Sequence, residues 1–186
     1  MRKFKKSELE EFLLDIDGEL RRRCTIVLIG GGAVGLRFEG THATSDLDLW
    51  SISESSFWKA VEKVNARRTE RIDVQKATIA QPPYTFEDRL TPLRIDGLSK
   101  LIVLVPEAHD LVLMKIARGE AHDLDAVEDI NRNQTLSLPI LIERYLETRS
   151  QVLGSLSLHQ LNFLAAVARL FGEDVALQTQ RRLRRR

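Results

Sequence analysis

The segment IVLIGGGAVGLRFEGTHATSDLDLW, residues 26–50, joins an apolar run, a glycine-rich turn and two aspartates that are one residue apart. Gly30, Gly32 and Gly35 follow a predicted strand with the G-x-G-x-x-G spacing of dinucleotide-binding turns. The same glycines, followed by an Asp-x-Asp strand, are also typical of a site where metal ions hold nucleotide phosphates. The residues around the glycines separate these two interpretations.

The dinucleotide interpretation needs a full helix after the glycines, because that helix holds the pyrophosphate at its N-terminus and returns the chain to a parallel strand. Here the apolar pattern ends by Phe38, and the turn residues EGTHATSD follow. Asp48 does lie near the offset of about 20 residues at which a ribose-binding acid is expected. However, a ribose needs one acid, and the chain has no second strand-helix-strand half. A dinucleotide-binding oxidoreductase is therefore the less favoured alternative.

The two aspartates of the strand fit a metal site better. In a strand, residues i and i+2 project from the same face, so we expect Asp46 and Asp48 (the carboxylate pair) side by side, with Leu47 and Leu49 in the core. Neighbouring carboxylates repel each other unless cations lie between them. Mg²⁺, or Mn²⁺ in its place, takes oxygen ligands, and two such ions can activate an attacking oxygen and stabilise a leaving pyrophosphate. The glycine turn would bring backbone N–H groups against the phosphates.

Two stretches of the chain resemble known proteins. IGGGA followed by HATSDLDLW is similar to the signature of the minimal nucleotidyltransferases of the polymerase-beta superfamily: a glycine turn, a short helix and an Asp-x-Asp strand. VPEAHDLVLMKIARGEAHDLDAVEDI resembles the helical part of the abortive-infection toxin nucleotidyltransferases, where a lysine-bearing helix precedes an acidic one. Together the resemblance covers about residues 26–130.

The resemblance implies a nucleotidyltransferase fold, which is an α/β (α+β) arrangement with a small mixed sheet flanked by helices. It also implies that Asp46 and Asp48 bind the metal and serve in catalysis, and that Lys115 steadies the triphosphate or the acidic cluster. The residues that it implies for nucleotide binding are Gly30, Gly31, Gly32, Ser45 and Lys115.

Many members of the superfamily carry a third carboxylate on a neighbouring strand, as the base that activates the acceptor. Asp73 in RIDVQ is the candidate for this catalytic role, because it alternates with Ile72 and Val74 and can therefore share the face of the carboxylate pair. Asp96 is the rival candidate.

The chain departs from the family pattern at two places. His42 stands where relatives often carry an arginine. Ala126 stands where the acidic helix commonly has a second aspartate after Asp123, with Asp125 and Asp129 nearby. Both departures concern the substrate side and leave the carboxylate pair intact.

Each candidate also has an ordinary structural explanation. The carboxylate pair and Asp73 can be solvated strand residues, and Lys115 can be a surface lysine whose stem covers an apolar helix. The run RRLRRR, residues 181–186, can be a solvated end or can bind RNA phosphates through its charge. The glycine turn favours the metal interpretation of the pair. For Lys115 only the resemblance favours function, and for the tail we favour the solvated end.

Composition narrows the class of protein. The 186 residues are 43% apolar and 30% charged with a net charge of +1, which is typical of a globular chain. No run of about 18 apolar residues and no signal-peptide core occurs, so we expect no membrane association. The single cysteine, Cys24, is compatible with the cytoplasm, and the histidines show no zinc-ligand spacing with it.

Strand patterns dominate the first part of the chain and helical patterns the second. We expect an α/β core over 1–105 and a helical C-terminal part over 106–186, with one continuous domain as the alternative. Strands are predicted at 24–30, 45–52 and 71–80 and around a turn in 93–106, and helices at 7–23, 33–38, 55–67, 106–119, 121–133, 136–154 and 155–172.

The residues and the resemblance together predict an enzyme that moves a nucleoside monophosphate from an NTP to a hydroxyl. The expected acceptor is an RNA 3′ end, such as that of a tRNA, or a protein hydroxyl. The family suggests a toxin–antitoxin or phage-defence setting with an antitoxin as partner. The alternative from another class is a nucleotide- or protein-binding module of the same fold whose activity has decayed.

Overall fold

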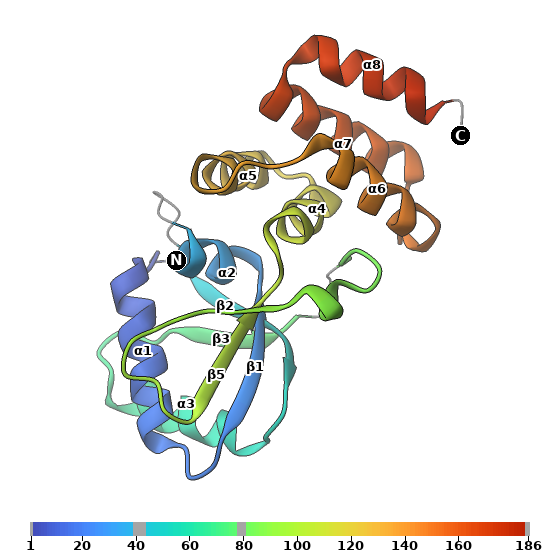
Figure 1. The fold of residues 1–186 in the computed structure, drawn as a ribbon. Coiled ribbons are helices and arrows are strands. Elements are labelled where there is room, and N and C mark those ends of the chain that lie inside the picture. The colour runs from blue at the N-terminus through green and yellow to red at the C-terminus, as the bar shows by residue number, and fades with distance from the viewer. Residues whose placement is uncertain (1, 39–43, 78–80, 185–186) are drawn as a thin grey trace. The chain divides into compact units, whose positions relative to one another are not determined.

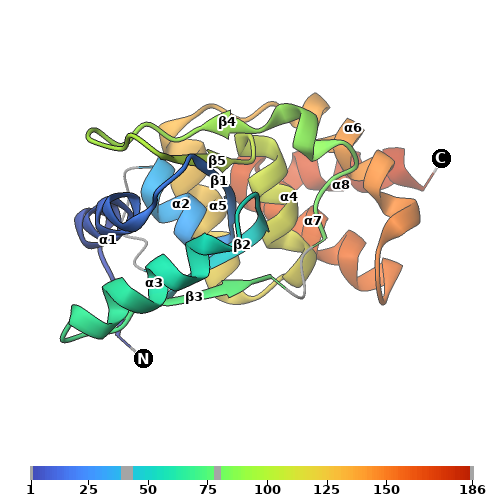
Figure 2. The ribbon, with the colours of Figure 1, turned by 90° about the horizontal axis from the view of Figure 1, so that it is seen from below.

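The protein combines one mixed sheet with a helical C-terminal half, as its computed structural model shows for residues 2–38, 44–77 and 81–184 (Figure 1; Figure 2 gives a second view). The sheet has five strands in the order β3-β2-β1-β5-β4. Parallel and antiparallel pairs both occur in it. The predicted fold class, α/β (α+β) with a small mixed sheet and a helical C-terminal half, is therefore confirmed.

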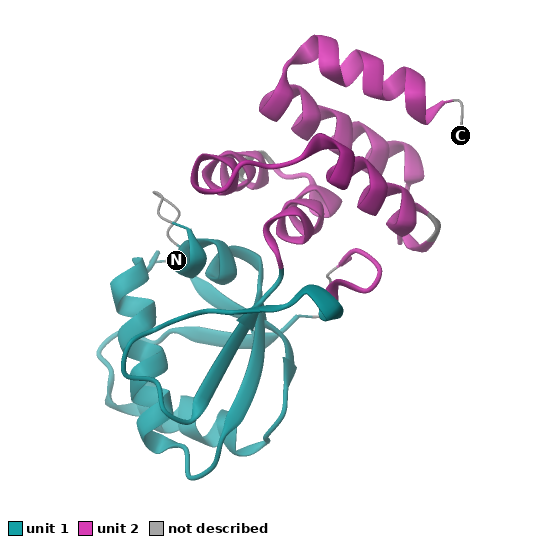
Figure 3. Cartoon of the chain, in the orientation of Figure 1, with its two compact units in different colours: residues 1–78, 87–106 teal, residues 79–86, 107–186 magenta. Residues whose placement is uncertain are grey.

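The chain forms two compact units (Figure 3). Unit 1 consists of residues 1–78 and 87–106, and it contains every strand found in the described residues. Unit 2 consists of residues 79–86 and 107–186, and its described part from residue 107 onward is mostly helical. A short 3-10 helix, η1 (Phe86–Arg89), lies where the chain returns to unit 1.

The sheet of unit 1 is built around β1. This strand pairs antiparallel with β2 and parallel with β5, while β2 pairs parallel with β3 and β5 antiparallel with β4. The strands are β1 (Cys24–Ile29), β2 (Asp46–Ile52), β3 (Asp73–Lys76), β4 (Thr91–Pro92) and β5 (Leu101–Val105). The two strands predicted around the turn in 93–106 are present as β4 and β5, but β4 lies earlier than predicted and ends at Pro92.

Three α-helices lie in the described residues of unit 1, namely α1 (Lys6–Glu19), α2 (Gly30–Arg37) and α3 (Ser56–Arg67). α1 packs against α3, and the two lie side by side in Figure 2. Their apolar faces are buried, through Leu9, Phe12, Leu13 and Ile16 of α1 and Phe57, Val61 and Val64 of α3. Apolar residues at this helical spacing form one buried face on each helix.

Two helices begin earlier than the sequence patterns predicted. α1 begins at Lys6, because the Phe4 N–H donates to the Thr44 carbonyl at 2.7 Å and the Lys5 N–H donates to the Glu8 carboxylate at 2.9 Å. α2 begins at Gly30 rather than at residue 33, so the glycines form its first turn.

Asp17 ties the end of α1 to the start of β5. Its buried carboxylate accepts the backbone N–H groups of Ser99, Lys100 and Leu101 at 3.0, 2.6 and 2.6 Å. The Ser99 hydroxyl donates to the second oxygen at 2.9 Å. Burial disfavours the charged form, but these hydrogen bonds outweigh it and lower the pKa of Asp17 below its ordinary value.

We expect Asp17→Asn to lower the free energy of unfolding by about 2–3 kcal/mol at neutral pH, because an amide donor replaces an acceptor oxygen. A lowered folded-state pKa contributes stability that is present above the unfolded pKa and is lost as pH falls through the folded value. The difference in free energy of unfolding between the wild type and Asp17→Asn should therefore become smaller in acid. Urea unfolding at pH 7 and at about pH 3 measures this difference, and a difference independent of pH would contradict an ionised Asp17 carboxylate.

Unit 2 is built around α4 and α7. α4 packs against α5, α6 and α7, and α8 packs against α7 (Figure 1). α4 ends at Gly119, whose φ of 71° closes the helix as predicted. The elements are α4 (Ala108–Arg118), α5 (Ala121–Asn133), α6 (Leu138–Thr148), the 3-10 helix η2 (Arg149–Gln151), α7 (Leu156–Phe171) and α8 (Glu173–Leu183).

α8 was not predicted. The run RRLRRR was expected to be a solvated end, but its first three residues complete α8 and Leu183 is buried. That prediction is wrong for residues 181–183, because Leu183 packs in the helical unit while the arginines beside it are exposed.

Candidate functional site

The carboxylate pair lies on one face of β2. Asp46 and Asp48 are both partly exposed, whereas Leu47 and Leu49 are buried on the opposite face. The alternation predicted from the sequence is present over the whole motif. Two carboxylates thus share one face of a strand whose other face is core.

The glycine turn lies directly beside the pair. β1 and β2 pair so that Ile29 lies opposite Asp48, and α2 begins at the next residue. Gly30 has a φ of 69°, and a Cβ at this position would lie 2.7 Å from Asp48 Oδ2. Both features require glycine. The first turn of α2, whose leading N–H groups have no acceptor within the helix, is therefore held next to the carboxylate of Asp48.

We expect Gly30→Ala to lower the free energy of unfolding by about 1–2 kcal/mol from the left-handed backbone alone. The added methyl would also collide with the Asp48 carboxylate and displace it. Gly18→Ala is the matched control, because nothing lies within 4 Å of its Cβ position inside α1. This control should gain about 0.5–1 kcal/mol from helix propensity. Equal stability of the two variants in chemical unfolding would contradict the close approach.

Thr44 supports the pair from the residue that precedes the strand. Its buried hydroxyl lies 3.2 Å from Asp46 Oδ1 and 3.1 Å from the Asp46 carbonyl oxygen. The Cβ position of Gly31 is 2.8 Å from this hydroxyl, and that of Gly32 is 2.6 Å from Leu47 Cδ2. Gly31 therefore faces the site, whereas Gly32 allows α2 to pack on the core.

β3 adds two polar side chains to the same face. Asp73 lies opposite Asp46 and Gln75 lies opposite Asp48 in the parallel register. Gln75 Nε2 donates to Asp48 Oδ1 at 3.0 Å and lies 3.5 Å from Asp46 Oδ2. The Asp73 side chain is 59% exposed, and its Oδ1 lies 3.7 Å from Nε of Arg71. Asp73 therefore shares the face of the pair at its solvent-exposed edge.

The donors on this face suit a hard divalent cation. Asp46 and Asp48 provide carboxylate oxygens, and Mg²⁺ is commonly bound by one or two carboxylates together with substrate phosphates and water. In the described part of the chain, no three His, Cys, Asp or Glu side chains gather into a group that could hold a metal ion. Among the described His, Cys, Asp and Glu side chains, Asp73 therefore does not join the carboxylate pair in such a group.

Lys115 lies in unit 2, where it is part of a buried ion pair. Its Nζ donates to Asp123 Oδ1 at 3.1 Å, and Arg118 reaches the same carboxylate with Nε and Nη2 at 2.9 and 2.7 Å. Burial disfavours the ionised form of Asp123, but the two cations outweigh it and hold the pKa of this carboxyl below its ordinary value. The surface-lysine explanation of Lys115 is therefore wrong, because Lys115 is 6% exposed and Asp123 is 0% exposed.

The other acids of α5 have different surroundings. Asp129 is buried and pairs with Arg132 at 2.5 Å, whereas Asp125 is exposed and lies 3.9 Å from Arg169. Ala126, at the position of the missing aspartate, is fully buried. This departure from the family pattern therefore lies in the core of unit 2.

Three further candidates lie at the margins. Ser45 directly precedes β2 and is partly exposed. Asp96 is exposed in the turn before β5, on neither of the strands that flank β2. His42 lies outside the described residues.

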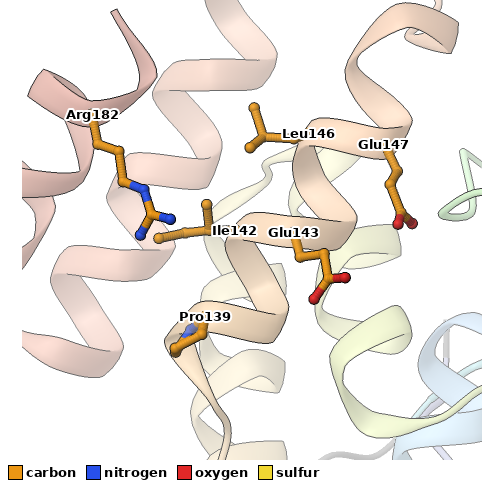
Figure 4. Close-up of a pocket in the computed structure, with 6 residues that line it drawn as sticks. All are labelled: Pro139, Ile142, Glu143, Leu146, Glu147 and Arg182. Carbon is orange, nitrogen blue, oxygen red and sulfur yellow. The ribbon is translucent and has the colours of Figure 1, made fainter. Parts of the chain in front are cut away.

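Unit 2 contains a hollow of about 450 Å³ between α6 and α8 (Figure 4). It is lined by Pro139, Ile142, Glu143, Leu146 and Glu147 of α6 and by Arg182 of α8. None of the predicted site residues lines it. The hollow is therefore not formed by residues of the candidate site.

The antiparallel pairing of β1 and β2 decides between the two interpretations of the glycines. A dinucleotide fold places a parallel strand after the glycine helix, whereas β2 runs antiparallel to β1, and α2 has only 8 residues. The dinucleotide-binding alternative is therefore wrong.

A family model described as "Nucleotidyltransferase of unknown function (DUF6036)" matches residues 7–170. The chain belongs to this nucleotidyltransferase family. The match includes the glycine turn, β2, β3 and the helices from α4 to α6. No curated protein and no solved structure matches the chain. None of the helices in the described residues has the length and apolar character that crossing a membrane requires.

Two polar residues of the candidate site were missed by the sequence analysis. Thr44 had a local signal, because a hydroxyl residue two positions before an aspartate can fold back on it. Gln75 had none, because its place opposite Asp48 depends on the register between strands that are far apart in the sequence.

Proposed function

We propose that this member of the nucleotidyltransferase family is a metal-dependent enzyme that transfers a nucleoside monophosphate from an NTP to a hydroxyl. The observation that carries the proposal is the close approach of Gly30 to Asp48. It brings backbone N–H groups, which suit phosphates, next to carboxylates, which suit Mg²⁺ or Mn²⁺. Such a combination matches the needs of a triphosphate bound through a cation.

Each residue on this face has a role in the proposal. Asp46 and Asp48 hold the divalent cation. When bound, the cation neutralises phosphate charge and stabilises the leaving pyrophosphate. The glycine turn, Gly30 to Gly32, orients the triphosphate through its backbone, and Ser45 contacts the nucleotide from the start of β2.

The transfer step breaks one phosphorus–oxygen bond and forms another. The acceptor hydroxyl oxygen bonds to the α-phosphorus of the NTP, and the bond between this phosphorus and the bridging oxygen of the β-phosphate breaks. Pyrophosphate leaves with the electron pair of that bond. The hydroxyl proton passes to Asp73. Two observations support this role: Asp73 lies opposite Asp46 in the register, and its side chain is exposed to an incoming acceptor.

For Lys115 we propose the second of its two implied roles, that of steadying the acidic cluster. Its ammonium is engaged by Asp123, so the contacts within unit 2 favour this role over a direct phosphate contact. The lysine would then maintain the helical unit that accompanies the transfer site.

The acceptor that we propose is an RNA 3′ end, with a protein hydroxyl as the other class. The exposed Arg181, Arg182 and Arg184 near the C-terminal end of α8 favour RNA, because phosphate contacts provide sequence-independent affinity. A toxin or phage-defence role with a separate antitoxin rests on the abortive-infection resemblance. The free, buried thiol of Cys24 fits a cytoplasmic setting.

The experiment offers each of the four α-labelled NTPs, with Mg²⁺, to total bacterial RNA and to lysate protein. The Asp46→Asn/Asp48→Asn double variant is run alongside. We expect label on one RNA or protein band with the wild type and none with the double variant. Mg²⁺-dependent nucleotide binding without any transfer would instead support the alternative, a binding module of the same fold whose activity has decayed.

A further inference from the structure

Gln75 bridges the two carboxylates from the neighbouring strand. Its Nε2 donates to Asp48 Oδ1 at 3.0 Å and lies 3.5 Å from Asp46 Oδ2. A primary amide carries two N–H groups, so one side chain can serve both aspartates. Register places it there, because Gln75 lies opposite Asp48 in the parallel pairing of β2 with β3.

The carboxylate pair is therefore held from two sides. The Thr44 hydroxyl approaches Asp46 Oδ1 at 3.2 Å, and the Gln75 amide approaches Asp46 Oδ2 and Asp48 Oδ1. Like charges on one strand face repel each other, and N–H donors between them offset part of this repulsion. The two carboxylates that accept from the Gln75 amide would also attract a cation to the space between them.

We infer that Gln75 is a positioning residue of the cation site and sets the affinity of the carboxylate pair for the cation. This inference rests on the proposed metal-dependent transfer. The last torsion of a glutamine side chain is broad, and half a turn about it exchanges Nε2 for Oε1. The side chain can thus offer donors to the bare carboxylates, or an oxygen of the type that Mg²⁺ prefers. It adds no charge, so the pair alone balances one divalent cation.

Three variants test the inference through Mn²⁺ affinity. Gln75→Ala should weaken binding on the order of tenfold, as is typical when a side chain that orients metal ligands is lost. Gln75→Glu should strengthen binding, because a third carboxylate faces the cation. It should also lower the melting temperature in EDTA, because three carboxylates then repel one another. Lys76→Ala is the matched control, since the adjacent β3 residue projects from the opposite face and should leave both readouts unchanged.

Mn²⁺ binding is measured on the full chain by electron paramagnetic resonance of the free ion, and folding by thermal unfolding in EDTA. Wild-type affinity in both Gln75 variants would overturn the inference and leave the proposed function standing. No binding by the wild type, or equal binding by the Asp46→Asn/Asp48→Asn variant, would overturn the proposed cation site and the inference together. Opposite shifts for Gln75→Ala and Gln75→Glu, with Lys76→Ala unchanged, support it.

Discussion

Replacing Asp46 and Asp48 together by asparagine is expected to reduce nucleotidyl transfer by at least about 10³-fold, because the charges that hold the cation are lost. Both side chains share one face of β2, next to the close contact between Gly30 and Asp48. Asparagine keeps the shape and the oxygen, so the expected loss reflects charge. The measurement is the initial rate of label transfer from an α-labelled NTP at saturating Mg²⁺.

The same substitution should leave the fold intact and raise the melting temperature in EDTA, because removing like charges relieves their repulsion. A rise in stability together with a loss of transfer is not expected of residues that serve packing. Asp73→Asn is the companion variant. It should lower the rate while Mn²⁺ affinity stays that of the wild type, because the Asp73 side chain is 59% exposed and its Oδ1 lies 3.7 Å from Nε of Arg71. An Asp46→Asn/Asp48→Asn variant that transfers label at the wild-type rate would refute the role of the carboxylate pair in transfer.

The second large effect concerns the buried ion pair of unit 2. Lys115→Met is expected to lower the free energy of unfolding by about 2–4 kcal/mol, because the buried Asp123 carboxylate then loses the ammonium that pairs with it at 3.1 Å. The Arg118 side chain is 52% exposed and compensates a fully buried carboxylate incompletely. Urea unfolding at neutral pH measures the difference.

Acid should reduce that difference. The pKa of Asp123 is lowered in the folded state, so the stability it contributes is present above its unfolded pKa and is lost as pH falls through the folded value. A Lys115→Met/Asp123→Leu double variant should recover much of the loss, because apolar replacement of both partners leaves no buried charge unpaired. A Lys115→Met variant within about 0.5 kcal/mol of the wild type would contradict the buried pair.

Patterns within one strand or one helix predicted the features that depend on neighbouring residues in the sequence. The alternation of Asp46, Leu47, Asp48 and Leu49 is a property of any strand, so it specified which side chains share a face. Gly119 was predicted as the end of α4 because helices commonly close with a left-handed glycine. In these places the chain's own geometry determines the outcome.

Non-local pairings were not predictable in the same way. Gln75 reaches the pair only because β3 joins β2 in one particular register, and a shift by one residue would have turned it to the other face. Lys115 gave a similar difficulty, since an apolar helix with one lysine has the same pattern whether the ammonium is solvated or meets a buried acid.

α8 shows a signal that was present and overlooked. Glu173 and Asp174 lie in its first turn and Arg181 and Arg182 in its last, which is the charge order that the helix dipole favours. Gly172 precedes it, and Leu183 is its buried apolar residue near the end. The arginine run drew the prediction toward a solvated tail although the charge pattern indicated a helix.

The most direct measurement follows transfer of α-phosphorus label by the wild-type protein, with Mg²⁺ and with EDTA, and counts the pyrophosphate released. If Asp46 and Asp48 form a cation-dependent transfer site, one pyrophosphate should appear for each nucleotide attached, and both should require the cation. Transfer that continues in EDTA, or label that becomes attached without release of pyrophosphate, would contradict the account.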